Sequence, residues 1–146
     1  MEKCIIQIVN KSKYPLPSYQ TEGSAGVDIY ANIDESMVIP VGSIRLIPTG
    51  FYLSLPIGYE AQIRARSGLS LKHGITLANG IGTIDSDYRG EIKVILINLG
   101  EKDYTLHPGD RIAQMVIKKY IYGTFEEVEI IDETKRGQGG FGHSGF

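Results

Sequence analysis

The close spacing of turn-forming residues constrains the fold of this chain more than any other feature. The 146 residues include 18 glycines and 6 prolines. Only residues 69–73 suit a helical turn, because nowhere do ten or more residues keep an apolar period near 3.6 with capping signals at both ends. Turn residues instead divide the chain into short segments, at Pro40, Pro48, Pro56, Gly58, Gly68, Gly74, Gly80, Gly82, Gly90, Gly100, Pro108 and Gly109. The sequence therefore predicts many short strands.

Three segments alternate between apolar and polar side chains, which is the period of a strand with one buried face. They are residues 27–31, 51–55 and 59–66, and Asp28 falls on the polar side of the first. A fourth segment, residues 92–99, is apolar on both faces after Lys93 and rich in β-branched residues. We expect it to be a central strand, inside the molecule or at a subunit interface. The pattern predicts an all-β fold, a sandwich or a barrel.

Length and charge limit the classes of partner. A chain of 146 residues fits one domain, and a net charge of −2 gives no general field for nucleic acid or an anionic membrane. The single cysteine, Cys4, cannot form an intrachain disulfide, and the three histidines do not have the spacing of a zinc site. No apolar run is long enough to cross a bilayer. We expect a cytoplasmic protein without nucleic-acid or membrane partners, with a nuclear location open for a eukaryotic or viral source.

The loop at residues 78–90 places two aspartates, a tyrosine and an arginine among glycines: Asp85, Asp87, Tyr88 and Arg89. Glycine permits a close approach of the backbone to a ligand. Asp, Ser and Gly are also ordinary turn residues, so an isolated loop of this kind is better explained as a hairpin connection.

A second cluster of hydrogen-bond donors follows the segment at 59–66. Arg66, Ser67 and the backbone amides after Gly68 can all donate to phosphate oxygens, and none repels an anion. A strand that stops at Gly68 beside a solvated arginine explains the same residues equally well.

The last twelve residues are rich in glycine. Gly137, Gly139 and Gly142 match a dinucleotide-binding fingerprint formally, but no strand precedes them and no helix can follow. The segment carries one arginine, two aromatic side chains and many unhindered amides, which suits a lid that orders over a flat, anionic ligand. A disordered terminus is the simpler alternative.

Five segments, residues 25–31, 65–70, 79–90, 109–116 and 136–145, occur together in an order and spacing that resembles the five motifs of the homotrimeric dUTP pyrophosphatase (dUTPase) family. The resemblance implies a distorted β-barrel or jelly-roll subunit of the β-clip type, with a domain at 1–131 and a flexible lid at 132–146 that reaches a neighbouring subunit. It implies hydrolysis of dUTP to dUMP and pyrophosphate, which limits uracil incorporation into DNA and supplies dUMP for thymidylate synthesis.

Within this resemblance, Asp85 is the general base for the water that attacks the α-phosphorus, and Tyr88 lies beneath the sugar and excludes a ribose hydroxyl. Asn79 and the backbone around Gly82 read the uracil edge. The implied substrate-binding residues are Arg66, Ser67, Gly68, Asn79, Gly82, Thr83, Asp85, Tyr88, Lys93, Gln114, Arg136, Phe141, Gly142 and Ser144.

The resemblance also assigns the phosphates and the lid. Phosphate oxygens are held by Arg66, Ser67 and Gln114, and the terminal phosphate by Arg136. Phe141 stacks on uracil, and Gly142 with Ser144 completes the lid. Mg²⁺ arrives with the triphosphate, and Asp28 supports it indirectly through water. His143 stands where the family usually has a serine, and we expect it to be tolerated without a catalytic role.

Two alternatives stay open. A dCTP deaminase resembles this family in fold and trimeric assembly, but the Asp85 to Tyr88 run and the tail at Arg136 favour the hydrolase. A non-catalytic, β-rich trimer is the other alternative, and the presence of the acidic loop speaks against it.

Overall fold

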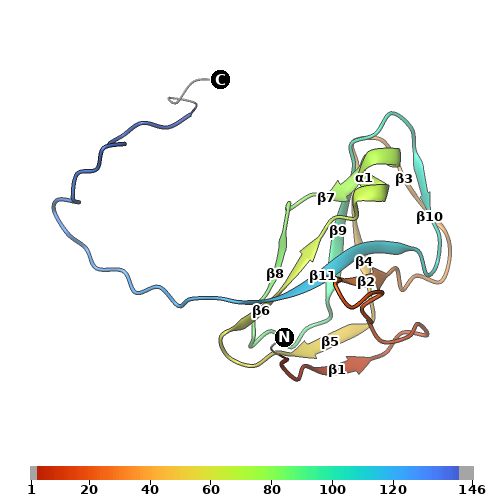
Figure 1. Cartoon of the computed structure of the whole chain (residues 1–146). Helices are drawn as coiled ribbons and strands as arrows, with labels where there is room; N and C mark the ends of the chain where they lie inside the picture. The colour runs from red at the N-terminus through yellow and green to blue at the C-terminus, as the bar shows by residue number, and fades with distance from the viewer. Residues whose placement is uncertain (1–2, 142–146) are drawn as a thin grey trace.

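Short strands dominate the computed structural model of the chain, which describes residues 3–141 (Figure 1). Those residues form eleven strands and one helix: β1 (Gln7–Asn10), β2 (Val27–Tyr30), β3 (Met37–Ile39), β4 (Ile44–Pro48), β5 (Phe51–Ser54), β6 (Tyr59–Arg64), α1 (Ser67–His73), β7 (Ile75–Leu77), β8 (Gly82–Ile84), β9 (Lys93–Asn98), β10 (Tyr104–Leu106) and β11 (Arg111–Lys119). The prediction of an all-β fold is confirmed.

The strands pair into four antiparallel sheets, with the orders β1-β5, β10-β3, β2-β11-β6-β8 and β4-β9-β7. β11 lies inside the largest sheet, where Met115 is opposite Val27 on one side and Ile63 on the other. Within residues 3–141 no sheet closes on itself, so the fold is a distorted jelly-roll rather than a regular barrel.

One core fills the space between the sheets, and the alternation in the sequence supplies it. In β6, Ala61 and Ile63 are buried while Gln62 and Arg64 remain partly exposed. β2 and β5 follow the same rule, because every second residue of each strand points inward. Asp28 is therefore on the polar face of β2, as the sequence predicts.

The segment predicted to be central, residues 92–99, is β9, which lies between β4 and β7. Its inner face is buried, with Val94, Leu96 and Asn98 in the core. Its outer face continues onto β4, because Ile97 pairs with Ile44 and Ile95 with Leu46. We call these four aliphatic residues the outer face: Ile44, Leu46, Ile95 and Ile97.

The expected helical turn is α1. It begins at Ser67, two residues before the predicted start, and ends at His73. Gly74 caps it, because a positive φ of 67° lets the Gly74 N–H reach Ser70 O at 3.0 Å. Gly74 also lies against the backbone of Gly100, which leaves no room for a side chain.

Beyond β11 the chain leaves the sheets, and residues 120–141 form no helix or strand (Figure 1). The predicted boundary between residues 131 and 132 stays a prediction. Residues 3–141 contain one helix, α1, and it is neither long enough nor apolar enough to cross a membrane.

Candidate functional site

A cavity of about 430 Å³ opens at β8 and gathers six of the predicted site residues: Asn79, Gly82, Thr83, Asp85, Tyr88 and Lys93. Aliphatic side chains from the neighbouring strands complete its wall, among them Ile63, Leu77 and Ile95. A mostly apolar space with a few convergent polar groups is the usual form of a small-molecule site.

β7 and β8 belong to different sheets and do not form a hairpin with each other; a tight turn that contains glycines joins them. Gly80 has a positive φ of 70°, and its N–H bonds to Leu77 O at 3.1 Å. A Cβ at Gly82 would lie 3.2 Å from Cβ of Ile63, a tight contact, so glycine lets β8 pack closely on β6. The turn sets Asn79 at the mouth of the cavity.

Asp85 follows the end of β8 and is exposed to solvent. A turn holds its backbone, since the N–H of Tyr88 bonds to Asp85 O at 3.2 Å. Within residues 3–141 its carboxylate forms no hydrogen bond or ion pair with a side chain or backbone group. The lone pairs of this carboxylate thus remain available to a ligand or a water.

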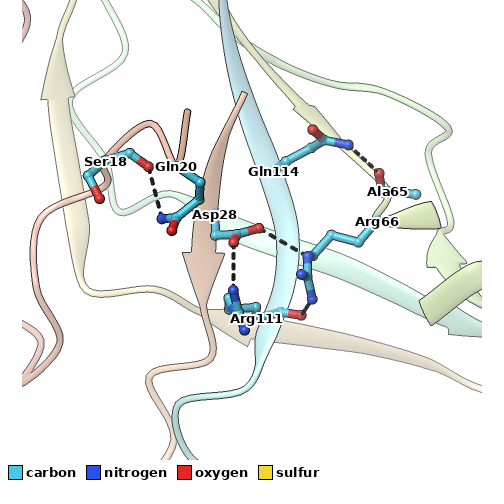
Figure 2. A network of polar contacts seen from close by, with 7 residues as sticks. All are labelled: Ser18, Gln20, Asp28, Ala65, Arg66, Arg111 and Gln114. Carbon is cyan, nitrogen blue, oxygen red and sulfur yellow. Dashed lines mark hydrogen bonds and ion pairs between the residues drawn. The ribbon is translucent and has the colours of Figure 1, made fainter. Parts of the chain in front are cut away.

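A second cluster of predicted residues lies around Asp28, at the other edge of the same sheet (Figure 2). Arg66 Nε lies 3.0 Å from Asp28 Oδ1, and Arg111 Nη1 lies 3.2 Å from Oδ2. Arg66 Nη1 also donates to the backbone carbonyl of Arg111 at 3.0 Å. Asp28 is only 15% exposed, so the guanidinium groups hold a largely desolvated carboxylate.

Gln114 joins this cluster from β11. Its Nε2 donates to the carbonyl of Ala65 at 3.0 Å, which fixes the chain just before Arg66 (Figure 2). A Cβ at Gly26 would come 2.6 Å from Gln114 Oε1, so glycine there makes room for the amide. Ser67 and Gly68 are exposed at the start of α1, one residue beyond Arg66.

The pKa of the Tyr104 phenol is perturbed. Burial raises the pKa of its phenol, the nearby Asp110 raises it further, and Arg66 lowers it. Tyr104 therefore belongs to the surroundings of the Asp28 cluster.

One chain does not bring all predicted residues together. β2 and β8 are the two edge strands of a four-stranded sheet, so about 14 Å of strand spacing separates Asp28 from β8. The cavity lining includes neither Arg66 nor Gln114. Arg136 and Phe141 are exposed in the C-terminal segment, and Gly142, His143 and Ser144 lie outside the described residues.

The sequence analysis did not single out three residues that the structure places in these clusters: Arg111, Glu91 and Gly90. Arg111 carried a usable signal, because it lies three residues before Gln114 in the same segment. Glu91 lines the cavity and accepts a bond from the N–H of Gly50 at 3.0 Å. The contact of Arg111 with Asp28 and that of Glu91 with Gly50 join residues far apart in the sequence, so local spacing does not predict them.

Comparison with known proteins places the chain. The dUTPase family model matches residues 12–145. A deoxyuridine 5'-triphosphate nucleotidohydrolase of Finegoldia magna is 55% identical over 97% of this chain and 99% of that protein. One of Rickettsia typhi is 60% identical over 90% of this chain and 88% of that protein. The dUTPase of Staphylococcus bacteriophage 80alpha, solved with dUPNHPP, superposes with a TM-score of 0.89 at 26% identity, over 99% of this chain and 100% of that one. The chain belongs to the dUTPase family.

Proposed function

We propose that this chain hydrolyses dUTP to dUMP and pyrophosphate through attack of a water, activated by Asp85, on the α-phosphorus. The observation that carries the proposal is the cavity at β8, where Asn79, Asp85 and Tyr88 line one space. The family supports the substrate, since the bacterial relatives are named for this reaction.

The base is recognised at the turn between β7 and β8. The side-chain amide of Asn79 offers a donor and an acceptor, and the backbone around Gly82 and Thr83 offers more of both. Uracil matches such a set with its two carbonyls and its ring N–H, whereas cytosine presents an amino group in place of one carbonyl. A mismatch leaves buried polar groups unpaired, which discriminates strongly between bases.

The sugar lies against Tyr88. The ring lines the cavity and is 44% exposed, so one part of it is free to contact a ligand. A ring close beneath C2' leaves no room for a ribose hydroxyl, and this exclusion separates dUTP from UTP.

Asp85 supplies the base for the reaction. Its oxygens have no partner among the described residues, so they can accept a proton from water. As the water oxygen bonds to the α-phosphorus, the proton passes to the carboxylate and the bond from phosphorus to the bridging oxygen breaks. Pyrophosphate leaves. A positioned general base contributes roughly two to four decades of rate.

The triphosphate is held by Arg66, Ser67, Gly68, Lys93 and Gln114. Nε of Arg66 pairs with Asp28, and Nη1 donates to the carbonyl of Arg111. These two contacts fix the guanidinium plane and leave Nη2 for a phosphate oxygen. Donors fixed in advance stabilise charge that develops during the reaction.

The residues of the chain fit Mg²⁺ that is carried by the triphosphate. Both oxygens of Asp28 already bind arginines, which favours an indirect action on the metal through water. Among residues 3–141 no three His, Cys, Asp or Glu side chains are grouped to hold an ion. Bound Mg²⁺ neutralises and orients the phosphates.

The active site forms between subunits of a homotrimer. The separation of Asp28 and Asp85 on one chain supports this, because both must reach one triphosphate. The outer face supplies an interface: Ile44 and Leu46 are 53% and 55% exposed, and Leu46 also borders the cavity. The lid then carries Arg136 to the terminal phosphate and Phe141 to the base, with Gly142 and Ser144 completing it.

In the cell, the reaction limits uracil incorporation into DNA and supplies dUMP for thymidylate synthesis. We propose a cytoplasmic location. The relatives from Finegoldia magna and Rickettsia typhi are bacterial, so they give no support to a nuclear one.

Release of pyrophosphate from dUTP, dCTP, dTTP and UTP tests the proposal. We expect turnover of dUTP with strong discrimination against the other three. Ammonia released from dCTP while dUTP stays intact would identify a deaminase instead. Nucleotide binding without any turnover would indicate a non-catalytic module.

A further inference from the structure

Gly90 lies against the hydroxyl end of the Tyr88 ring. A Cβ built on Gly90 would come 2.5 Å from Cζ of Tyr88 and 2.9 Å from Cε2, and closer still to the hydroxyl oxygen. Real side chains do not approach to such distances, so an alanine at this position and the present place of the ring are incompatible.

Backbone conformation does not explain the glycine. Gly90 is not among the described glycines with positive φ, which include Gly80 and Gly109. An alanine could adopt the same backbone angles without strain. The absence of a side chain at Gly90 therefore serves the close approach of the Tyr88 ring.

The hydroxyl end of the ring is also fixed. Tyr88 Oη donates to the backbone carbonyl of Glu91 at 3.0 Å. The Glu91 carboxylate accepts the N–H of Gly50 at 3.0 Å and lies 3.7 Å from Lys93 Nζ. The next residue, Ile92, is buried and its N–H bonds to Phe51 O at 2.8 Å. The acceptor of the hydroxyl thus belongs to a segment anchored on the start of β5.

We infer that Gly90 is a specificity-determining residue, which sets the height of the Tyr88 ring in the cavity and so the selection of deoxyribose over ribose. The inference rests on the proposed hydrolysis of dUTP and on Tyr88 facing the sugar. Gly90 touches no substrate atom in this arrangement and acts through the ring alone.

The matched pair of variants is Gly90→Ala and Gly23→Ala. Gly23 has open space around it and no positive φ, so an added methyl group there meets nothing. The quantity to measure is the ratio of kcat/KM for dUTP to kcat/KM for UTP. We expect Gly90→Ala to lower this ratio by about tenfold or more, because the ring must leave its place, and Gly23→Ala to leave it unchanged.

The double variant Tyr88→Ala with Gly90→Ala shows whether the ring carries the effect. Once the ring is absent, the alanine at position 90 should change the ratio no further. Tyr88→Phe is a second probe that adds no volume. It removes only the bond to Glu91, so we expect a smaller fall in the ratio, and thermal melting checks that each variant is folded.

The outcomes separate this inference from the proposed function. If Tyr88→Ala lowers the ratio while both Gly90→Ala and Tyr88→Phe keep it within about twofold of wild type, Gly90 does not set the ring and the inference is overturned. An equal effect of Gly90→Ala with and without the ring overturns it too. A ratio unchanged in Tyr88→Ala refutes the sugar role of Tyr88, and no dUTP turnover in the wild type refutes the proposed function itself.

Discussion

Arg66 Nε and Asp28 Oδ1 lie 3.0 Å apart, and this pair joins the start of α1 to an edge strand far away in the sequence. The second oxygen of Asp28 is bound by Arg111, so the carboxylate orients two guanidinium groups that repel each other. The proposed binding of phosphate by Arg66 therefore depends on Asp28, which itself binds no phosphate.

Substituting Asp28 with Asn removes the charge but little volume. The arginines lose their shared anion, so Arg66 should no longer be held for the triphosphate. We expect kcat/KM for dUTP to fall by about 10- to 100-fold. Steady-state kinetics measure this, with Asp34→Asn as the exposed control that should match wild type. A normal kcat/KM in Asp28→Asn would show that Arg66 is positioned by other contacts.

Asp85→Asn tests the general base. The amide keeps the shape of the side chain but cannot take a proton from water, so nucleotide binding should persist while turnover falls by at least about two decades. Calorimetric titration with dUTP gives the binding and a pyrophosphate assay gives the rate. Asp87→Asn is the matched control, because Asp87 is in the same loop and does not line the cavity. Unchanged turnover in Asp85→Asn would contradict the assigned role.

The pattern of apolar and polar residues along the chain predicted the strands whose burial alternates from residue to residue. Period-two alternation located β2, β5 and β6 to within two residues at their ends, and the apolar run located β9. The alternation did not predict β11, because both faces of this strand are largely covered and its register shifts between Arg111 and Ala113. Strands of three residues, such as β3 and β10, are too short to show a period.

The site divides along the same line. Asn79, Asp85 and Tyr88 lie within ten residues of one another around β8, so their grouping in the cavity follows from chain proximity. The pairing of Asp28 with Arg111 depends on which strands are neighbours, and no spacing in the sequence encodes it. Resemblance to the family supplied Asp28 and Arg66 as site residues, but neither Arg111 nor the ion pairs that join the three residues.

Removing the chain from Arg136 onward tests the lid. Residues 120–141 are exposed and add no strand to the sheets, so the shortened chain should keep its fold and its assembly. Without Arg136 and Phe141 the terminal phosphate and the base lose contacts made on closure, and we expect little activity. Circular dichroism and size-exclusion chromatography monitor the fold and the assembly. Normal kinetics in the shortened chain would exclude a lid function.

Tyr104 links stability to pH. Its pKa is raised above the ordinary value of 10.0, chiefly by burial, so the folded state holds the phenolic proton more tightly than the unfolded state. The contribution of Tyr104 to the free energy of unfolding is therefore fully present below pH 10.0, and it is lost as the pH rises through the pKa of the folded state. Urea unfolding at pH 9 and pH 11 should show about the same fall in Tyr122→Phe as in wild type, and a smaller fall in Tyr104→Phe. Equal falls in all three proteins would contradict the predicted coupling.

Ile44→Glu tests the outer face as the interface of the trimer. Ile44 is 53% exposed and is opposite Ile97, so a carboxylate there would be buried beside aliphatic side chains in an assembled interface but solvated in a single chain. The oligomer should dissociate while each subunit stays folded. Because the Asp28 cluster and Asp85 are at opposite edges of one sheet, dissociation should also abolish turnover. Sedimentation velocity measures the mass, and Ile57→Glu, at a turn residue that is 92% exposed, is the control expected to remain assembled and active. A fully active, monomeric Ile44→Glu would mean that one chain alone completes the site.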